Sequence, residues 1–88
     1  MKNKNAQLKG RYSSMTVQQL EILAKLIKND WINYTSDLDH MKGKISYKKG
    51  RYKVKFDYMN TWVVKGRTVL AAYEKTLDDE LLDLIFNL

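Results

Sequence analysis

Residues 43–57, GKISYKKGRYKVKFD, decide the expected fold of this chain. Apolar and polar residues alternate on both sides of Lys49 and Gly50, which is the pattern of a β-hairpin. A two-residue turn at these positions places the apolar side chains on one face, and a shift by one residue would bury lysines instead. A four-residue loop over 48–51 gives the same register. The predicted pairs are Lys48 with Arg51, Tyr47 with Tyr52, Ser46 with Lys53, and Ile45 with Val54.

The opposite face of this hairpin is strongly basic. Seven cations and no acid fall between residues 42 and 55, and the next basic residues follow at the end of the expected third strand. Lysine and arginine side chains gathered on one surface are typical of proteins that bind the phosphates of nucleic acids. The alternative is a solvated lysine coat that only keeps the protein soluble. The candidate polyanion-binding residues are Lys44, Lys48, Lys49, Arg51, Lys53, Lys55, Lys65 and Arg67.

Helical periodicity surrounds the hairpin. Thr16 and Gln19 have the spacing of a capping box, so a helix is expected over 16–28, and its continuation to Tyr34 is left open. Residues 33–42 form a connection in which one helical turn over 36–41 is an option. A final helix is expected from Thr68, because leucines recur at helical spacing up to Leu88, with a second capping box at 76–79 where this helix could break.

The third strand is expected over 61–65, and its register decides the position of Trp62. A three-residue loop would pair Trp62 with Phe56 and place the indole in the core. A two-residue loop would turn the indole onto the basic face, where it could stack on bases. The core position is the favoured prediction.

These elements predict an α+β fold of one helix, a three-stranded antiparallel sheet and a second helix, with both helices on one sheet face. Residues 15–88 are expected to form a single domain, preceded by a mobile basic arm over residues 1–14.

The predicted topology resembles that of double-stranded-RNA-binding domains. The family binds duplex RNA partly through the loop between its first two strands, which residues 48–51 match, and through lysines at the start of its last helix, which 65–68 do not supply. Residues 51–86 also resemble the antitoxin half of HicB-like toxin–antitoxin pairs, in the Gly-x-Thr of 66–68 and the Ala-containing segment that follows. The sequence assigns no family.

Composition limits the chemistry. The chain has 88 residues, one histidine, no cysteine and a net charge of +6. Residues 1–55 carry 13 basic and 4 acidic side chains, a net +9, whereas 56–88 carry 3 and 6, a net −3. No catalytic motif, metal-ligand set or apolar run of membrane length occurs, so we expect a cytoplasmic protein that is not an enzyme and has no cofactor or metal. The abundance of lysine, asparagine, isoleucine and tyrosine suggests an AT-rich bacterial or phage genome.

Two functions remain. The first is a small nucleic-acid-binding module whose basic hairpin face contacts the phosphates of DNA or RNA with low sequence specificity. The second is a protein-binding regulator from a phage or mobile element, either an antitoxin or an inhibitor of a host nuclease or CRISPR effector. This regulator would dock through the basic face and an apolar C-terminal helix. The helix is also expected to form a protein interface, most simply a homodimer, through Leu82, Ile85 and Phe86.

Overall fold

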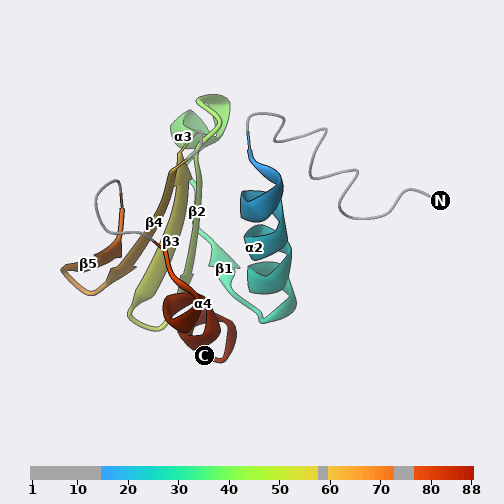
Figure 1. The fold of residues 1–88 in the computed structure, drawn as a ribbon. Coiled ribbons are helices and arrows are strands. Elements are labelled where there is room, and N and C mark those ends of the chain that lie inside the picture. Colours follow the sequence, from blue (N-terminus) through green and yellow to red (C-terminus); the bar gives the residue numbers. More distant parts are fainter. Residues whose placement is uncertain (1–14, 58–59, 73–76) are drawn as a thin grey trace.

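A computed structural model of the chain describes residues 15–57, 60–72 and 77–88 (Figure 1). The predicted basic arm over residues 1–14 lies outside this part of the chain. The described elements, in chain order, are α2 (Val17–Lys28), β1 (Ile32–Asn33), α3 (Asp37–Met41), β2 (Ile45–Lys49), β3 (Tyr52–Asp57), β4 (Asn60–Lys65), β5 (Thr68–Ala71) and α4 (Asp79–Phe86).

Within the described residues, the strands form one antiparallel sheet of five strands in the order β1-β2-β3-β4-β5. Each strand therefore pairs with its neighbour in sequence. The prediction of a three-stranded sheet between two helices is wrong, because one strand was missed on each side of the predicted three. The topology of double-stranded-RNA-binding domains is consequently not the topology of this chain.

Strand β5 occupies the position where the last helix was expected to begin. Gly66 and Arg67 form a two-residue turn, with Gly66 at a φ of +59°, and Lys65 pairs with Thr68 across it. The β-branched residues of the Thr-Val-Leu-Ala segment suit a strand that continues from such a turn. The helix begins only at α4, where the Asp78 side chain accepts a hydrogen bond of 2.8 Å from the Leu81 backbone N–H.

The hairpin of β2 and β3 is present, but its turn lies at Gly50 and Arg51 and not at Lys49 and Gly50. Gly50 has a φ of +60°, which glycine adopts readily at the first loop position, whereas a lysine there would be strained. The partners of β2 therefore move by two residues along β3. A shift of two keeps the other strand side chains on their predicted faces, but it moves Lys49 from the turn into β2 and Arg51 from β3 into the turn. The observed pairs are Ile45 with Phe56, Ser46 with Lys55, Tyr47 with Val54, Lys48 with Lys53, and Lys49 with Tyr52.

Helix α2 begins as the sequence predicts. The Thr16 side chain accepts from the Gln19 N–H, and the Gln19 side chain accepts from the Thr16 N–H, which completes the capping box. The helix ends at Lys28, before Asp30 takes a φ of +65°. It does not continue to Tyr34, because residues 32–33 pair with β2 instead. The optional helical turn of the following connection is present as α3, capped by Ser36.

The buried side chains form one hydrophobic cluster between the helices and one face of the sheet. Val54, Phe56 and Val63 line the sheet side of this cluster, Leu23 comes from α2, and Ile85 comes from α4; each of these five is at most 1% exposed. Helices α2 and α4 therefore pack on the same face, as Figure 1 shows, and α3 lies at one end of the sheet. The other face of β2, β3 and β4 is covered by neither α2 nor α4, and we call it the outer face.

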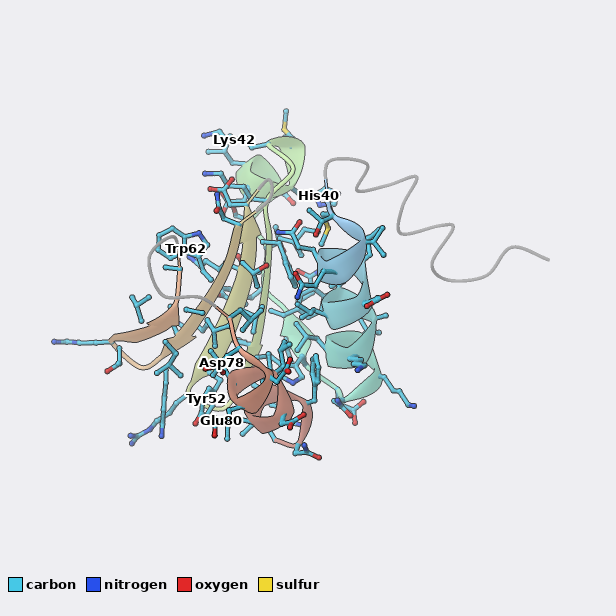
Figure 2. All side chains as sticks on the ribbon, in the orientation of Figure 1. His40, Lys42, Tyr52, Trp62, Asp78 and Glu80 are labelled. Carbon is cyan, nitrogen blue, oxygen red and sulfur yellow. The ribbon has the colours of Figure 1, made fainter. Side chains whose placement is uncertain are left out.

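Trp62 lies on this outer face, so its predicted core position is wrong. Asp57 pairs with Asn60, which leaves only two residues between β3 and β4, and Trp62 then pairs with Lys55. The inward residue of this segment is Val63, which is fully buried. Figure 2 shows the indole on the side of the sheet that faces away from α2.

Candidate nucleic-acid interface

The outer face brings lysines and an aromatic side chain together across three strands. Lys48 on β2 pairs with Lys53 on β3, and Lys55 on β3 pairs with Trp62 on β4. Side chains opposite each other in an antiparallel sheet have Cβ atoms only about 4.5–5.5 Å apart. The three lysines are exposed, and Trp62 is half-buried. The sheet thus presents positive charge and an aromatic surface on the same side.

Tyr34 adds a second aromatic ring to this face. Its backbone N–H donates to the Ser46 carbonyl (2.9 Å), which aligns residues 34–35 along the outer edge of β2. The ring lies under two ammonium groups, with Lys48 Nζ 5.5 Å and Lys53 Nζ 5.9 Å from its centroid. Burial raises the pKa of Tyr34 above its usual value, and the Ser46 side chain opposes part of this shift. The phenol therefore stays neutral at physiological pH, and its π-face helps to hold two lysines in place.

Ser46 belongs to the outer face by position but is not accessible. Its backbone N–H donates to the Thr35 Oγ1 (2.8 Å), and only 4% of its surface is exposed. The segment that carries Tyr34 and Thr35 covers it. The accessible basic surface is consequently displaced from the first half of β2 towards β3 and β4.

A second group of cations lies at the end of the sheet where two turns meet. The sequence Lys-Gly-Arg occurs at 49–51 and again at 65–67, and in each copy glycine and arginine form the turn. The Gly66 N–H donates to the Arg51 carbonyl (3.0 Å), so the two turns are in direct contact. Arg51, Lys65 and Arg67 are exposed, and Lys65 Nζ lies 5.4 Å from the ring centroid of Tyr52. The repeated tripeptide marks this end of the sheet as basic.

Two of the predicted polyanion-binding lysines are engaged within the chain. Lys44 Nζ forms an ion pair of 3.7 Å with Asp57 Oδ2 on the outer face. Lys49 lies on the helix side of the sheet, where its ammonium donates to the Asn29 carbonyl (2.8 Å) and to the Leu88 backbone oxygen (2.6 Å). Lys49 therefore connects the hairpin to the end of α2 and to residue 88, and it does not belong to the outer face.

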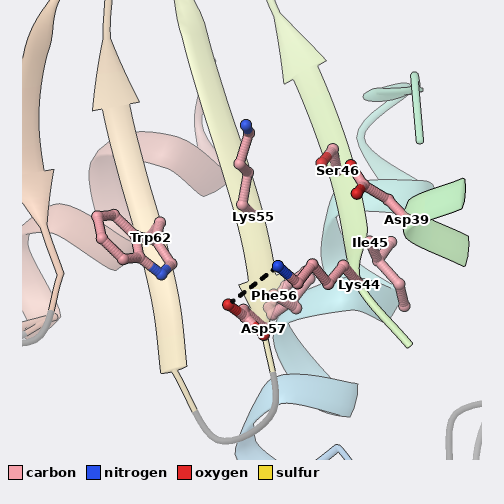
Figure 3. A pocket seen from close by; sticks show the side chains of 8 residues that line it. All are labelled: Asp39, Lys44, Ile45, Ser46, Lys55, Phe56, Asp57 and Trp62. Carbon is pink, nitrogen blue, oxygen red and sulfur yellow. Dashed lines mark ion pairs between the residues drawn. The ribbon is translucent and has the colours of Figure 1, made fainter. Parts of the chain in front are cut away.

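A hollow of about 370 Å³ opens beside Trp62, as Figure 3 shows. The indole stands on one side and Asp39 of α3 on the other, with the Lys44–Asp57 pair between them. Lys55 and Ser46 also line it. The sequence pointed to the lysines, but not to this hollow or to Tyr34. The sequence feature that could have indicated this site is the alternative two-residue loop between the second and third predicted strands, which places Trp62 on the outer face.

The residues predicted as a protein interface pack within the chain. Ile85 is fully buried, and Leu82 and Phe86 are partly buried against the core. Lys25 Nζ lies 4.7 Å from the ring centroid of Phe86, and the Asn29 side chain donates to the Phe86 carbonyl (3.0 Å). These side chains hold α4 against α2. Their predicted role in docking a partner stays a prediction.

Among the described residues, no group of three or more His, Cys, Asp or Glu side chains could hold a metal ion. No helix within the same residues is long and apolar enough to cross a membrane. Comparisons of the chain with protein-family models, with curated proteins and with solved structures found no match. The outer face, with its exposed lysines and Trp62, is therefore the feature of this chain from which a function can be inferred.

Proposed function

We propose that this protein binds single-stranded nucleic acid across the outer face of its sheet, with low overall sequence specificity. One observation carries the proposal: exposed lysines and half-buried aromatic rings lie together on the sheet face opposite α2 and α4. The lysines are Lys48, Lys53 and Lys55, and the rings are Tyr34 and Trp62.

The two kinds of side chain match the two parts of a single strand. Its phosphates attract lysines, and binding releases the counterions condensed along the strand. Its unpaired bases offer flat faces that stack on aromatic side chains, whatever the base. A duplex would use only the lysines, because its bases are stacked within the helix and side chains cannot reach their faces. The combination on this face therefore favours a single strand over a duplex.

The net charge of +6 supports the same partner. The exposed turn residues Arg51 and Arg67 lie at one end of the sheet and would extend the positive surface along a bound strand. Such a surface raises the association rate for a polyanion and makes the affinity depend steeply on salt.

The proposal is tested by fluorescence anisotropy of labelled single-stranded and duplex DNA and RNA at several salt concentrations. We expect binding to single strands to be tighter at each salt concentration. The double substitution Lys53→Gln and Lys55→Gln is expected to lower the slope of log K against log salt by about 1.4, because each phosphate contact to a single strand contributes about 0.7. Trp62→Ala is expected to weaken binding with an unchanged slope.

The matched control is the double substitution Lys25→Gln and Lys28→Gln on α2, which removes the same charge from the opposite side of the sheet. Its salt slope is expected to stay near that of the wild type. Equal losses in the two double variants would mean that net charge and not the outer face governs binding. Absence of binding to every nucleic acid at low salt would refute the proposal.

A further inference from the structure

The hollow beside Trp62 has the size and walls of a site for one flat ring system. Its volume of about 370 Å³ lies near the lower end of the range of about 300–1,000 Å³ that small-molecule pockets occupy. Trp62 lines one side, and the rest is lined by charged side chains together with Ile45, Ser46 and Phe56 (Figure 3). A base of a strand that crosses the outer face would meet this hollow directly.

The Asp57 carboxylate gives the hollow an acceptor that needs a donor. Its Oδ2 atom pairs with Lys44, whereas its Oδ1 atom is buried and accepts no hydrogen bond from any described residue. Buried polar atoms in folded proteins nearly always have a partner, so an orphaned carboxylate oxygen beside a pocket is a place for a ligand donor. The adjoining ammonium of Lys44 is a donor at 3.7 Å from the same carboxylate. The hollow therefore offers an acceptor next to a donor.

This order of groups distinguishes the two pyrimidines of RNA. Cytosine presents an exocyclic amine beside a ring nitrogen that accepts, which complements a carboxylate beside an ammonium. Uracil has the same shape but carries a carbonyl oxygen in place of the amine and an N–H in place of the accepting ring nitrogen. In the same pose the carboxylate would repel this oxygen, and the ammonium would meet a donor. Aspartate and glutamate accept from the N4 amine of cytosine in known protein–nucleic acid contacts.

We infer that this hollow is a base subsite that selects cytosine over uracil, with Trp62 stacking on the base and Asp57 accepting its amine. The inference rests on the proposed function and adds one base-selective position to an otherwise tolerant surface. Lys55, which also lines the hollow, is placed to contact a neighbouring phosphate. The indole supplies affinity for either base, and the carboxylate supplies the choice between them.

The test compares short oligocytidylate and oligouridylate at neutral pH and one salt concentration. The wild type is expected to bind the cytosine strand about tenfold more tightly, a typical effect of a single well-placed base contact. Asp57→Asn is expected to bring this ratio close to one, because an amide can present a donor or an acceptor to the base. The matched control is Asp79→Asn, which removes the same charge from the exposed start of α4 and should keep the wild-type ratio.

Thermal unfolding of each variant shows whether the fold is retained, and the wild-type ratio needs no variant at all. A wild-type ratio near one, with binding and salt slope intact, would overturn the subsite and leave the proposed function standing. Persistence of the cytosine preference in a folded Asp57→Asn would also overturn it. Failure of both strands to bind would remove the proposed function, and with it the subsite.

Discussion

Substitution of Lys49 by methionine distinguishes a structural lysine from a phosphate-binding one. The Lys49 ammonium donates to the Asn29 carbonyl at 2.8 Å and to the Leu88 backbone oxygen at 2.6 Å. Asn29 is the C-terminal cap of α2, where a positive charge also opposes the helix dipole. Methionine keeps an unbranched apolar side chain at this half-buried position and removes the charge and both hydrogen bonds.

The expected loss follows from these contacts. A hydrogen bond that involves a charged group contributes about 1.5–3 kcal/mol. The bond to Asn29 is partly buried and should contribute in this range, whereas the bond to Leu88 is exposed and solvent screens most of its contribution. We therefore expect Lys49→Met to lower the free energy of unfolding by about 2–3 kcal/mol. In a chain of this length each kcal/mol lowers Tm by about 4–8 °C.

Urea unfolding followed by circular dichroism measures this loss. The matched control is Lys55→Met on the exposed outer face, for which we expect a change within about 0.5 kcal/mol. In the nucleic-acid-binding assay we expect the opposite ranking of the two variants, with the larger effect for Lys55→Met. Lys55→Met is expected to lower the salt slope by about 0.7, and Lys49→Met is expected to leave it unchanged while the protein is folded.

The opposite pattern would refute the reasoning. If Lys49→Met were as stable as the wild type and bound nucleic acid with a reduced salt slope, Lys49 would contact the ligand, as the sequence alone had suggested. Its bonds to Asn29 and Leu88 would then contribute nothing measurable to the fold.

Substitutions at four further positions test the fold. Gln19→Glu should destabilise by about 2–4 kcal/mol in chemical unfolding, since the buried Gln19 side chain donates to the Asn60 carbonyl at 3.0 Å and a carboxylate cannot; no change would mean that this bond is not formed. Gly50→Ala and Gly66→Ala should each lower the free energy of unfolding by about 1–2 kcal/mol. The loss comes from the positive φ alone, because a Cβ meets no atom within 4 Å at either turn. Gly50→Asn should lower it less, because asparagine tolerates positive φ better than alanine. Phe86→Ala should lower the free energy of unfolding of the single chain by about 2–3 kcal/mol, which is less than for a fully buried ring because Phe86 is only partly buried. A variant that is as stable as the wild type but sediments differently would show that Phe86 serves an interface instead.

Local pattern was sufficient for the parts of this fold that depend on near neighbours. The capping box of Thr16 and Gln19 sets the start of α2 through bonds that span three residues. The alternation along residues 44–57 placed the apolar residues on the inner face correctly, even though the turn was predicted one residue early and Lys49 lies on the helix side. The observed register differs by two residues, and a period-2 pattern cannot detect such a shift.

Tertiary structure decided the number of strands and the face of Trp62. In residues 61–65 both faces carry a valine, and the face with Trp62 is the more apolar in composition, so hydrophobicity alone favoured burying the indole. The two-residue spacing between Asp57 and Asn60 set the opposite register and buried Val63. Residues 68–71 joined the sheet because the edge of β4 satisfies their backbone hydrogen bonds, which no property of those residues alone reveals.

Tertiary structure also decided which basic residues share a surface. The sequence determined that the hairpin is rich in cations, and it assigned all of them to polyanion binding. The fold instead directs Lys49 to the carbonyl at the end of α2, pairs Lys44 with Asp57, and sets Lys55 beside Trp62. These differences arise between segments far apart in the chain, because the position of a charge depends on which distant acceptor, carboxylate or ring the packed elements bring to it.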